Sequence, residues 1–378
     1  MTGHQLQRFR QFIAPKRYVQ GPNALDSLGE FAAELGQRPV IITDPFVEEI
    51  FGSRLLQTLG EKTPILILAG EITPSSCADL VIQARLTDCD VVIGIGGGKA
   101  LDAGKFVARE TGAALINVPT IASNDAPTSR AVALYDEADH KLIVQVLDRN
   151  PDLVLVDTVA IAQAPAAFLR SGIGDAIAKF AEAEGTAASR DGRTMTGMAP
   201  SLAGLVLARA ARDILHADAE AALLRCGSAE PNAAFERVIE AVVLLSGLGF
   251  ENGGLGLAHA MTRGLIGLER TRRATHGEHV AYGLLVMLAL DKDTAALKHE
   301  QAFLARIGLP ASLRWFGGDA ITKEEIGYLA AMAMTATQHV QNYADPITRE
   351  QIVAAIARVE ELAQASRVDF ACRTLADS

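Results

Sequence analysis

The chain has 378 residues, of which 49% are hydrophobic and 21% charged, and these proportions exclude an intrinsically disordered or low-complexity protein. Lysine and arginine number 35 against 45 acidic residues, which gives a net charge of −10. Because nucleic acids and anionic membranes attract positive protein surfaces, we expect neither as a partner. The four cysteines form no CxxC pair, which favours reduced thiols in the cytoplasm over a disulfide framework or a thiolate zinc site.

The length and the most apolar windows of the sequence also limit which class of protein this can be. The first twelve residues, MTGHQLQRFRQF, contain no apolar run, so we expect no signal peptide. The most apolar windows, such as 280–290, are too short to span a bilayer. At roughly 150 residues per domain, the length predicts two domains, with three as the alternative.

Up to about residue 160, short apolar runs alternate with amphipathic stretches. The runs are rich in Val and Ile and are bounded by turn residues, which is typical of parallel strands buried on both faces. They are 39–43, 65–68, 90–96, 114–119 and 152–157, with helical stretches at 24–36, 77–88 and 99–110. This alternation predicts a doubly wound α/β fold with a parallel sheet. Two further runs, 130–137 and 141–147, surround Asp139 and predict a hairpin.

After Ala160 the strand signals stop and helical periodicity takes over. The expected helices are 165–187, 200–216, 233–248, 255–267, 278–291, 295–307, 322–342 and 348–366. The pattern predicts an all-α C-terminal domain. We place an α/β domain at 1–164 and a helical domain at 165–378. Since no biased linker separates them, we expect closely apposed domains with a ligand cleft between them.

A glycine-rich turn follows the strand at 90–96. The segment DVVIGIGGGKALDAGK (90–105) runs through Gly96, Gly97 and Gly98 into a helix that begins near Lys99. Glycines let a phosphate approach the backbone, and the free N–H groups of a new helix favour an anion. The spacing is neither GxGxxG nor the Walker pattern. Taken alone, the turn is therefore as compatible with a tight strand-to-helix connection that binds no ligand as with a phosphate-binding site.

Two polar features follow neighbouring strands. Asp44 comes after the strand 39–43, where an acid can hold an adenosine ribose and repel a 2′-phosphate, but it would also cap the helix after Pro45. The loop PTIASNDAPTS (119–129) follows the strand 114–119. Loops at this end of parallel strands bind ligands, although Ser, Asn and Asp are also ordinary turn formers.

One carboxylate and two histidines suggest a metal site. Asp175 lies in GIGDAIAKFAEAE (172–184), His259 in GLGFENGGLGLAHA (247–260) and His276 in THGEHVAYG (275–283). Such a set suits a catalytic zinc with an open position, or ferrous iron. Each residue alone has a simpler explanation, because Asp is a common N-cap and a lone His is usually packed in a core.

Other histidines are weaker candidates. His279 follows His276 by three residues and is a rival or accessory ligand, and His339 is an outside candidate. The remaining histidines, His216 and His299 among them, stand in no recognisable motif.

Seven collinear segments resemble the glycerol dehydrogenase branch of the iron-containing alcohol dehydrogenase and dehydroquinate synthase-like family. They are 17–25, 94–105, 118–129, 153–165, 172–184, 247–260 and 275–283. The resemblance implies an N-terminal dinucleotide-binding domain, a helical metal-binding domain and a homo-oligomer. It also implies NAD-dependent, zinc-dependent oxidation of glycerol or a related small polyol to the hydroxyketone by reversible hydride transfer, with Fe2+ as the alternative metal.

The resemblance further implies roles for individual residues. Asp175, His259 and His276 correspond to the metal ligands, and Asp125 and Phe250 fall where the family contacts its substrate. The cofactor contacts correspond to Asp44, Gly96, Gly97, Gly98, Lys99, Thr120, Ser123, Ser129 and Tyr135. The acid at position 44 implies NAD over NADP.

The chain departs from the family pattern at several positions. These are Asn124, Arg130, Asn252, His279 and the arginine run Arg270, Arg272 and Arg273. The arginines are consistent with a solvated face, or with recognition of an anionic substrate. A dehydrogenase of an anionic polyol such as a glycerol phosphate therefore stays open. So do a dehydroquinate synthase-like lyase on the same scaffold and a non-catalytic nucleotide-binding relative.

Overall fold

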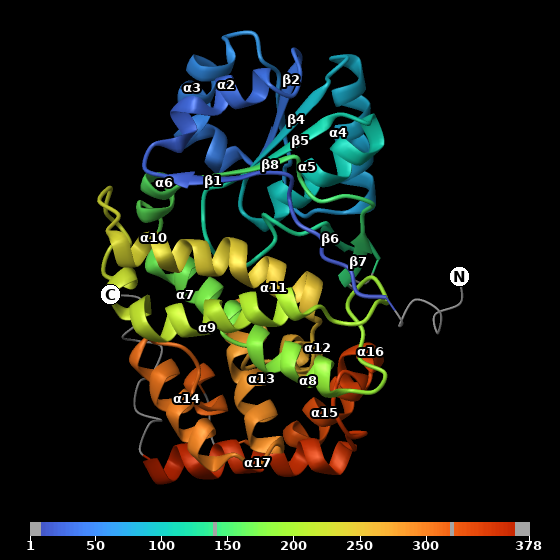
Figure 1. Cartoon of the computed structure of the whole chain (residues 1–378), viewed down its shortest axis with the longest axis vertical. Coiled ribbons are helices and arrows are strands. Elements are labelled where there is room, and N and C mark those ends of the chain that lie inside the picture. The colour runs from blue at the N-terminus through green and yellow to red at the C-terminus, as the bar shows by residue number, and fades with distance from the viewer. Residues whose placement is uncertain (1–8, 139–141, 318–320, 367–378) are drawn as a thin grey trace. The chain divides into compact units, whose positions relative to one another are not determined.

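The computed structural model describes residues 9–138, 142–317 and 321–366, which fold into two compact units (Figure 1). The sheet unit comprises Ile13–Pro165 and Arg225–Gly247. The helical unit comprises the described parts of Met1–Phe12, Ala166–Leu224 and Leu248–Ser378. The division into folding domains at residues 164 and 165 stays a prediction. Within the compact units, the segment 225–247 belongs with the sheet.

Six parallel strands form the sheet in the order β1-β8-β5-β4-β2-β3. They are β1 (Tyr18–Gly21), β2 (Pro39–Thr43), β3 (Ile65–Ile67), β4 (Val91–Gly96), β5 (Ala114–Pro119) and β8 (Leu153–Asp157). Successive residues face two separate cores, so Val40 and Val92 pack on one side while Ile41 and Ile93 pack on the other. The predicted parallel α/β fold is confirmed.

Helices cover both faces of this sheet, as Figure 1 shows for α2 and α3 against α4 and α5. The helical segments of the sheet unit are η1 (Ala24–Ser27), α2 (Leu28–Ala33), α3 (Pro45–Leu59), α4 (Pro74–Leu86), α5 (Gly98–Thr111), α6 (Thr158–Ala162), α10 (Ala233–Glu240) and the π-helix η2 (Ala241–Leu245). The predicted hairpin consists of antiparallel β6 (Ala131–Tyr135) and β7 (Leu142–Val146). Asp139 lies outside the described residues.

The sheet has a topological switch point between β2 and β4. The chain leaves β2 toward β3 on one side, and β4 pairs with β2 on the other. At such a point the connections diverge beyond the carboxyl ends of the strands and leave a crevice for a ligand. Because Ile42 pairs with Gly94, Asp44 and Gly96 emerge level with each other at this crevice.

The helical unit is built around one apolar helix, α13 (His276–Leu290), which is buried over most of its length. Two glycines let it touch its neighbours, since a Cβ on Gly277 would overlap the Ser171 carbonyl of α7 and one on Gly283 would overlap the Ala258 carbonyl of α12. The other helices are α7 (Ala166–Ala176), α8 (Lys179–Ala188), α9 (Leu202–Leu223), α11 (Ser246–Gly253), α12 (Leu257–Gly267), α14 (Thr294–Arg306), η3 (Leu313–Phe316), α15 (Lys323–Met334), α16 (Thr337–Gln341) and α17 (Arg349–Ser366). The C-terminal region is largely helical, as predicted. Among the described residues, no helix combines the length and apolar character that crossing a membrane requires.

Candidate active site

The three predicted metal ligands converge in the helical unit. Asp175 lies in the last turn of α7, His259 in the first turn of α12 and His276 at the start of α13. Their ligand atoms all lie within 4.8 Å of one another, with Asp175 Oδ1 at 3.2 Å from His259 Nε2 and 3.6 Å from His276 Nε2. Asp175 is therefore not an N-cap. One carboxylate oxygen and two imidazole nitrogens form a donor set that fits Zn2+ or Fe2+.

Exposure differs within this trio. Asp175 is 1% exposed and His259 7%, whereas the side chain of His276 is 47% exposed. A metal ion held by the three residues would be enclosed by protein around Asp175 and accessible beside His276. Catalytic zinc sites keep one coordination position for substrate in this way.

Lys179, which no sequence pattern singled out, points at the same donor atoms. Its Nζ donates to Asp175 Oδ1 at 2.6 Å and lies 3.0 Å from His259 Nε2. Burial would raise the pKa of Asp175, but the Lys179 ammonium and the two imidazoles hold that pKa well below its ordinary value. The carboxylate is thus ionised. The ammonium marks a cationic position on which the Asp175 and His259 donor atoms already converge, which is what metal binding requires of them.

Glu182 on α8 orients His259 from behind. Its Oε2 accepts from His259 Nδ1 at 2.7 Å, while its Oε1 accepts from the backbone N–H groups of Gly256 and His259 at 2.8 and 2.9 Å. Burial lowers the pKa of His259, but the charge of Glu182 and the hydrogen bonds to Glu182 and Asp175 together outweigh it and raise the pKa to about 9. A carboxylate on the far nitrogen of a ligating imidazole fixes the ring and strengthens it as a ligand.

The other two candidate histidines do not join the trio. His279 turns toward Thr271, whose carbonyl oxygen lies 2.8 Å from its Nε2, and burial lowers the pKa of His279 to about 4. His339 lies on α16, and burial likewise lowers its pKa to about 4. Phe250, the predicted substrate contact, is buried on α11 with its ring centroid 5.4 Å from Lys179 Nζ, so it lies beside the lysine that contacts Asp175 and His259.

In the sheet unit, Asp44 and the glycine turn lie side by side. Asp44 caps α3, because its Oδ1 accepts from the backbone N–H groups of Phe46 and Val47 at 3.0 Å each. A Cβ on Gly96 would lie 3.2 Å from Asp44 Oδ2 and 2.9 Å from the Ala100 Cβ, and Gly96 has a φ of 140°. Glycine is thus required at position 96 for both space and conformation.

The start of α5 is suited to an anion. Gly97 occupies the N-cap and has no side chain to satisfy the first N–H groups of α5, which follow from Gly98 onward. These groups carry the positive end of the helix dipole. Lys99 Nζ pairs with Glu71 Oε1 at 2.6 Å, and both side chains are about half exposed. For an anion at this turn, the backbone N–H groups are therefore better placed than the Lys99 ammonium, which is already paired.

The polar loop after β5 returns to the glycine turn. Thr120 donates its backbone N–H to Gly96 O at 3.1 Å, and Asn124 Nδ2 would lie 3.1 Å from a Cβ on Gly98. Within the same unit, Ser246 Oγ donates to Asp125 Oδ2 at 3.2 Å and Thr128 Oγ1 donates to Val243 O at 2.9 Å. The loop is therefore anchored on η2 and the residues that follow it.

The remaining predicted cofactor contacts differ in burial. Thr120 and Ser129 are buried, whereas Ser123 and Tyr135 are partly exposed. Tyr135 ends β6 and packs against the core beneath α4. Their contacts with a cofactor stay predictions.

Most of the arginines considered for recognition of an anionic substrate form ion pairs or hydrogen bonds with other residues of the protein. Arg270 forms a two-pronged pair with Glu325 at 2.9 and 3.3 Å, and Arg272 pairs with Glu269 at 2.9 Å. Arg130 donates to the Asp148 carbonyl oxygen at 3.3 Å. Arg270 thus joins two segments of the helical unit, a structural role.

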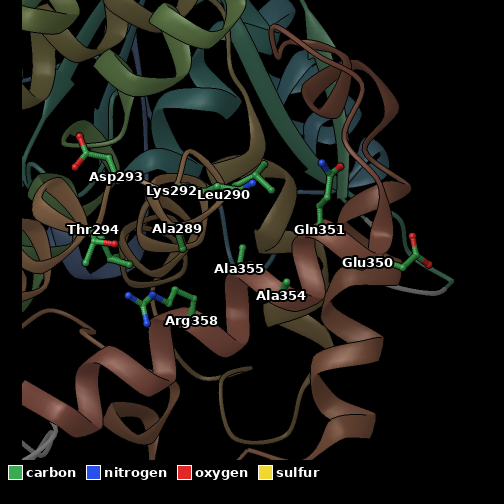
Figure 2. Close-up of a pocket in the computed structure, with 11 residues that line it drawn as sticks. Ala289, Leu290, Lys292, Asp293, Thr294, Glu350, Gln351, Ala354, Ala355 and Arg358 are labelled. Atoms are coloured by element: carbon green, nitrogen blue, oxygen red, sulfur yellow. The ribbon is translucent and has the colours of Figure 1, made fainter.

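Two hollows of the helical unit are lined by other residues. One, of about 490 Å3, lies between the end of α13, the start of α14 and α17, and Figure 2 shows Asp293, Glu350 and Arg358 around it. The other, of about 1010 Å3, is bounded by α8, α9, α13 and α14. Neither lining includes a member of the Asp175, His259 and His276 trio.

Comparison with known proteins places this geometry in a family. Residues 15–158 match the sequence profile of the iron-containing alcohol dehydrogenases. Glycerol dehydrogenase of Thermotoga maritima is 38% identical over 355 residues, covering 91% of this chain and 95% of that relative. Glycolaldehyde reductase of Halobacterium salinarum is 34% identical over 360 residues, covering 94% and 98%. The crystal structure of glycerol dehydrogenase from Schizosaccharomyces pombe superposes with a TM-score of 0.87 at 32% identity, covering 94% of this chain and 92% of that one.

An α/β unit with a crevice at its switch point and a helical unit with a converging Asp-His-His group agree with the fold of a known enzyme family. The chain belongs to the iron-containing alcohol dehydrogenase family, and it is an alcohol dehydrogenase by class. Within that family its similarity is to the glycerol dehydrogenases.

Proposed function

We propose that this chain oxidises glycerol or a related small polyol to the hydroxyketone, with NAD as hydride acceptor and Zn2+ in the helical unit. The observation that carries the proposal is the convergence of Asp175 Oδ1, His259 Nε2 and His276 Nε2 within 4.8 Å. The names of the relatives, glycerol dehydrogenase and glycolaldehyde reductase, support a small hydroxylated substrate.

The cofactor assignment is supported by the switch point of the sheet. Asp44 would hold the adenosine ribose through Oδ2, because its Oδ1 is already engaged as the cap of α3. The uncapped N–H groups of α5 would hold the pyrophosphate. An acid at position 44 disfavours a 2′-phosphate by charge repulsion, and this favours NAD over NADP.

The metal would be held by Asp175, His259 and His276, and when bound it would polarise the substrate hydroxyl as a Lewis acid. Glu182 keeps the Nδ1 proton of His259, so that Nε2 faces the donor set. The half-exposed His276 leaves one side of the trio accessible to a small alcohol. Asp125, whose carboxylate accepts from Ser246 within the sheet unit, is proposed as a substrate contact on the family resemblance. Phe250 would limit the size of that substrate.

A screen of NAD reduction tests the proposal. Purified protein is assayed with glycerol, other neutral diols, glycerol phosphate and hydroxy acids, before and after chelation and with Zn2+ or Fe2+ added back. We expect NADH from neutral polyols, loss of that activity on chelation and recovery with added metal. Absence of NADH with every neutral polyol, or full activity after complete metal removal, would contradict the proposal.

The same screen separates the alternatives. Turnover of glycerol phosphate well above glycerol would favour an anionic polyol, although the pairing of Arg270 with Glu325 argues against that arginine as an anion site. A lyase of the dehydroquinate synthase type regenerates its NAD and would yield no net NADH. The homo-oligomer expected from the resemblance stays a prediction.

A further inference from the structure

A second group of metal-ligating side chains lies in the helical unit, away from the Asp175 trio. His216 on α9 meets His299 and Glu300 on α14, two helices labelled in Figure 1. The ligand atoms of the three residues all lie within 4.8 Å of one another. His216 Nε2 is 3.2 Å from Glu300 Oε2, and the two imidazole rings are 5.2 Å apart.

Glu300 is the unusual member of this group. It is 7% exposed, and its Oε2 faces His216. Its other oxygen, Oε1, is buried, and no hydrogen-bond donor among the described residues reaches it. A buried carboxylate oxygen that accepts no hydrogen bond destabilises a fold, because it has lost its contact with water and gained no partner in return. A cation bound between Glu300 and the imidazoles would compensate that charge.

The surrounding hollow is lined mainly by acidic side chains among its charged residues. The group lines the hollow of about 1010 Å3, together with the acidic residues Glu184, Asp213, Asp291 and Asp293. Among the described lining residues, the one permanent cation is Arg212, which already pairs with Asp213 at 2.8 Å. Burial, together with the charges of Glu184 and Asp293, raises the pKa of Asp291 to about 6. The part of this shift that comes from Glu184 and Asp293 reflects negative charge that a metal ion in the hollow would also meet.

The distances suit a transition metal. Zinc binds imidazole nitrogen at about 2.0–2.1 Å and carboxylate oxygen at about 2.0–2.2 Å, so two ligands of one tetrahedral ion lie roughly 3.3 Å apart. The separation of 3.2 Å between His216 and Glu300 matches this value. His299 is exposed, so its side chain can rotate to close the remaining gap. Water in the hollow would supply the fourth ligand.

We propose that His216, His299 and Glu300 form a second binding site for a divalent transition-metal cation of the Zn2+ type. The site links α9 to α14 and stabilises the helical unit. It takes no part in hydride transfer, and the inference does not depend on the proposed function. An exposed ion pair between Glu220 and Arg306, at 3.0 Å, joins the same two helices without offering a metal site, and it provides a matched control.

Zinc stoichiometry tests the proposal on the intact chain. After equilibration with Zn2+ and gel filtration, we expect two zinc ions per wild-type chain and one in the His216→Ala, His299→Ala double variant. The double variant should keep its NADH-producing activity, and the Glu220→Gln control should keep both ions. Equal zinc contents in the wild-type chain and the double variant would overturn the second site, whatever the occupancy of the Asp175 centre.

A second measurement isolates the new site. In a His259→Ala, His276→Ala variant the proposed catalytic centre is removed, and Zn2+ alone is titrated by calorimetry. We expect one equivalent of Zn2+ and a melting temperature that rises by several degrees, because a ligand that binds only the folded state stabilises it. In the same background, the additional substitution Glu300→Gln should weaken zinc binding by at least about tenfold. An unchanged affinity after Glu300→Gln would overturn the site even where the first test is met.

Discussion

Each unit buries an Asp–Lys pair, and the two pairs differ in what completes them. In the sheet unit, Lys105 Nζ donates to Asp102 Oδ1 at 2.8 Å, and the other partners of the pair are backbone groups of β6 at Ala131 and Ala133. In the helical unit, Lys179 Nζ donates to Asp175 Oδ1 at 2.6 Å, and the other partners are the imidazoles of His259 and His276.

The pKa directions of the two acids follow from this difference. Burial raises the pKa of Asp102 above its ordinary value in spite of Lys105. Burial acts on Asp175 in the same way, but a lysine and two imidazoles together reverse its effect. A buried pair completed by backbone groups joins a helix to a strand. A buried pair completed by titratable side chains concentrates donor atoms at one point, which is the property of a binding site.

Asp175→Asn should give the largest effect. The substitution keeps the size of the side chain but removes the charged ligand, so we expect loss of the metal from the centre. Because a metal contributes several kcal/mol of transition-state stabilisation, NADH production should fall by roughly 1000-fold or more. Metal analysis and the polyol assay measure both, and circular dichroism checks the fold. A variant that keeps both the metal and its activity would exclude Asp175 as a ligand, and an active variant without the metal would show that activity does not need it.

Asp102→Asn should show the opposite behaviour. It leaves the Lys105 ammonium buried without an anion, so we expect a loss of about 3–5 kcal/mol in the free energy of unfolding. Urea unfolding measures this loss. The zinc content and the rate per folded molecule should stay at wild-type values. A specific loss of activity without destabilisation would mean that the sheet-unit pair is not merely structural.

His279→Gln should change the pH dependence of stability. Unfolded His279 takes up a proton near its ordinary pKa of 6.5, whereas the folded residue stays neutral down to about 4. Its contribution to stability is therefore present above pH 6.5 and is lost as the pH falls toward 4, by roughly 3 kcal/mol in total. Urea unfolding at several pH values should give a flatter profile for the variant. Parallel profiles would show that His279 is not buried in its neutral form.

Glu182→Gln should give a smaller, graded effect on the metal centre. The variant keeps a hydrogen-bond acceptor for His259 but loses the charge, and such changes behind a metal ligand weaken binding by roughly 10–100-fold. The zinc concentration that restores activity after chelation measures this shift. Glu184→Gln, an exposed position on the same helix, is the matched control. Equal zinc requirements in both variants would show that Glu182 does not support His259.

The sheet could be predicted because its strands are buried on both faces. Continuous Val and Ile runs located β2, β3, β4, β5 and β8 to within a residue or two. β1 was not predicted, because all four of its residues are only partly buried and its sequence contains no apolar run. The helix at 233–248 was also expected, but periodicity does not say which core a helix packs against. Only hydrogen bonds such as Gln20 Nε2 to Glu236 Oε2 at 2.8 Å place that segment with the sheet.

The site was only partly predictable for a related reason. The sequence motifs predicted Asp175, His259 and His276 as metal ligands, but they predicted no role for Lys179 or Glu182. Lys179 and Glu182 follow Asp175 by four and seven residues, which is a helical spacing, and this was the available signal. In the structure Asp175 lies in the last turn of α7, whereas Lys179 and Glu182 lie at the start of α8. His216 and Glu300 had no such signal, because they belong to different helices and meet only through packing.

Asp44 uses its two carboxyl oxygens differently, Oδ1 as the cap of α3 and Oδ2 toward Gly96. On the proposed role of Asp44 against a 2′-phosphate, a lineage that came to accept a 2′-phosphorylated cofactor would have to lose the acid without uncapping α3. Ser, Thr or Asn would keep the cap, while Ala would cost about 1 kcal/mol. The evolutionary route to a new cofactor preference is therefore narrow, because helix stability restricts which residues can replace Asp44.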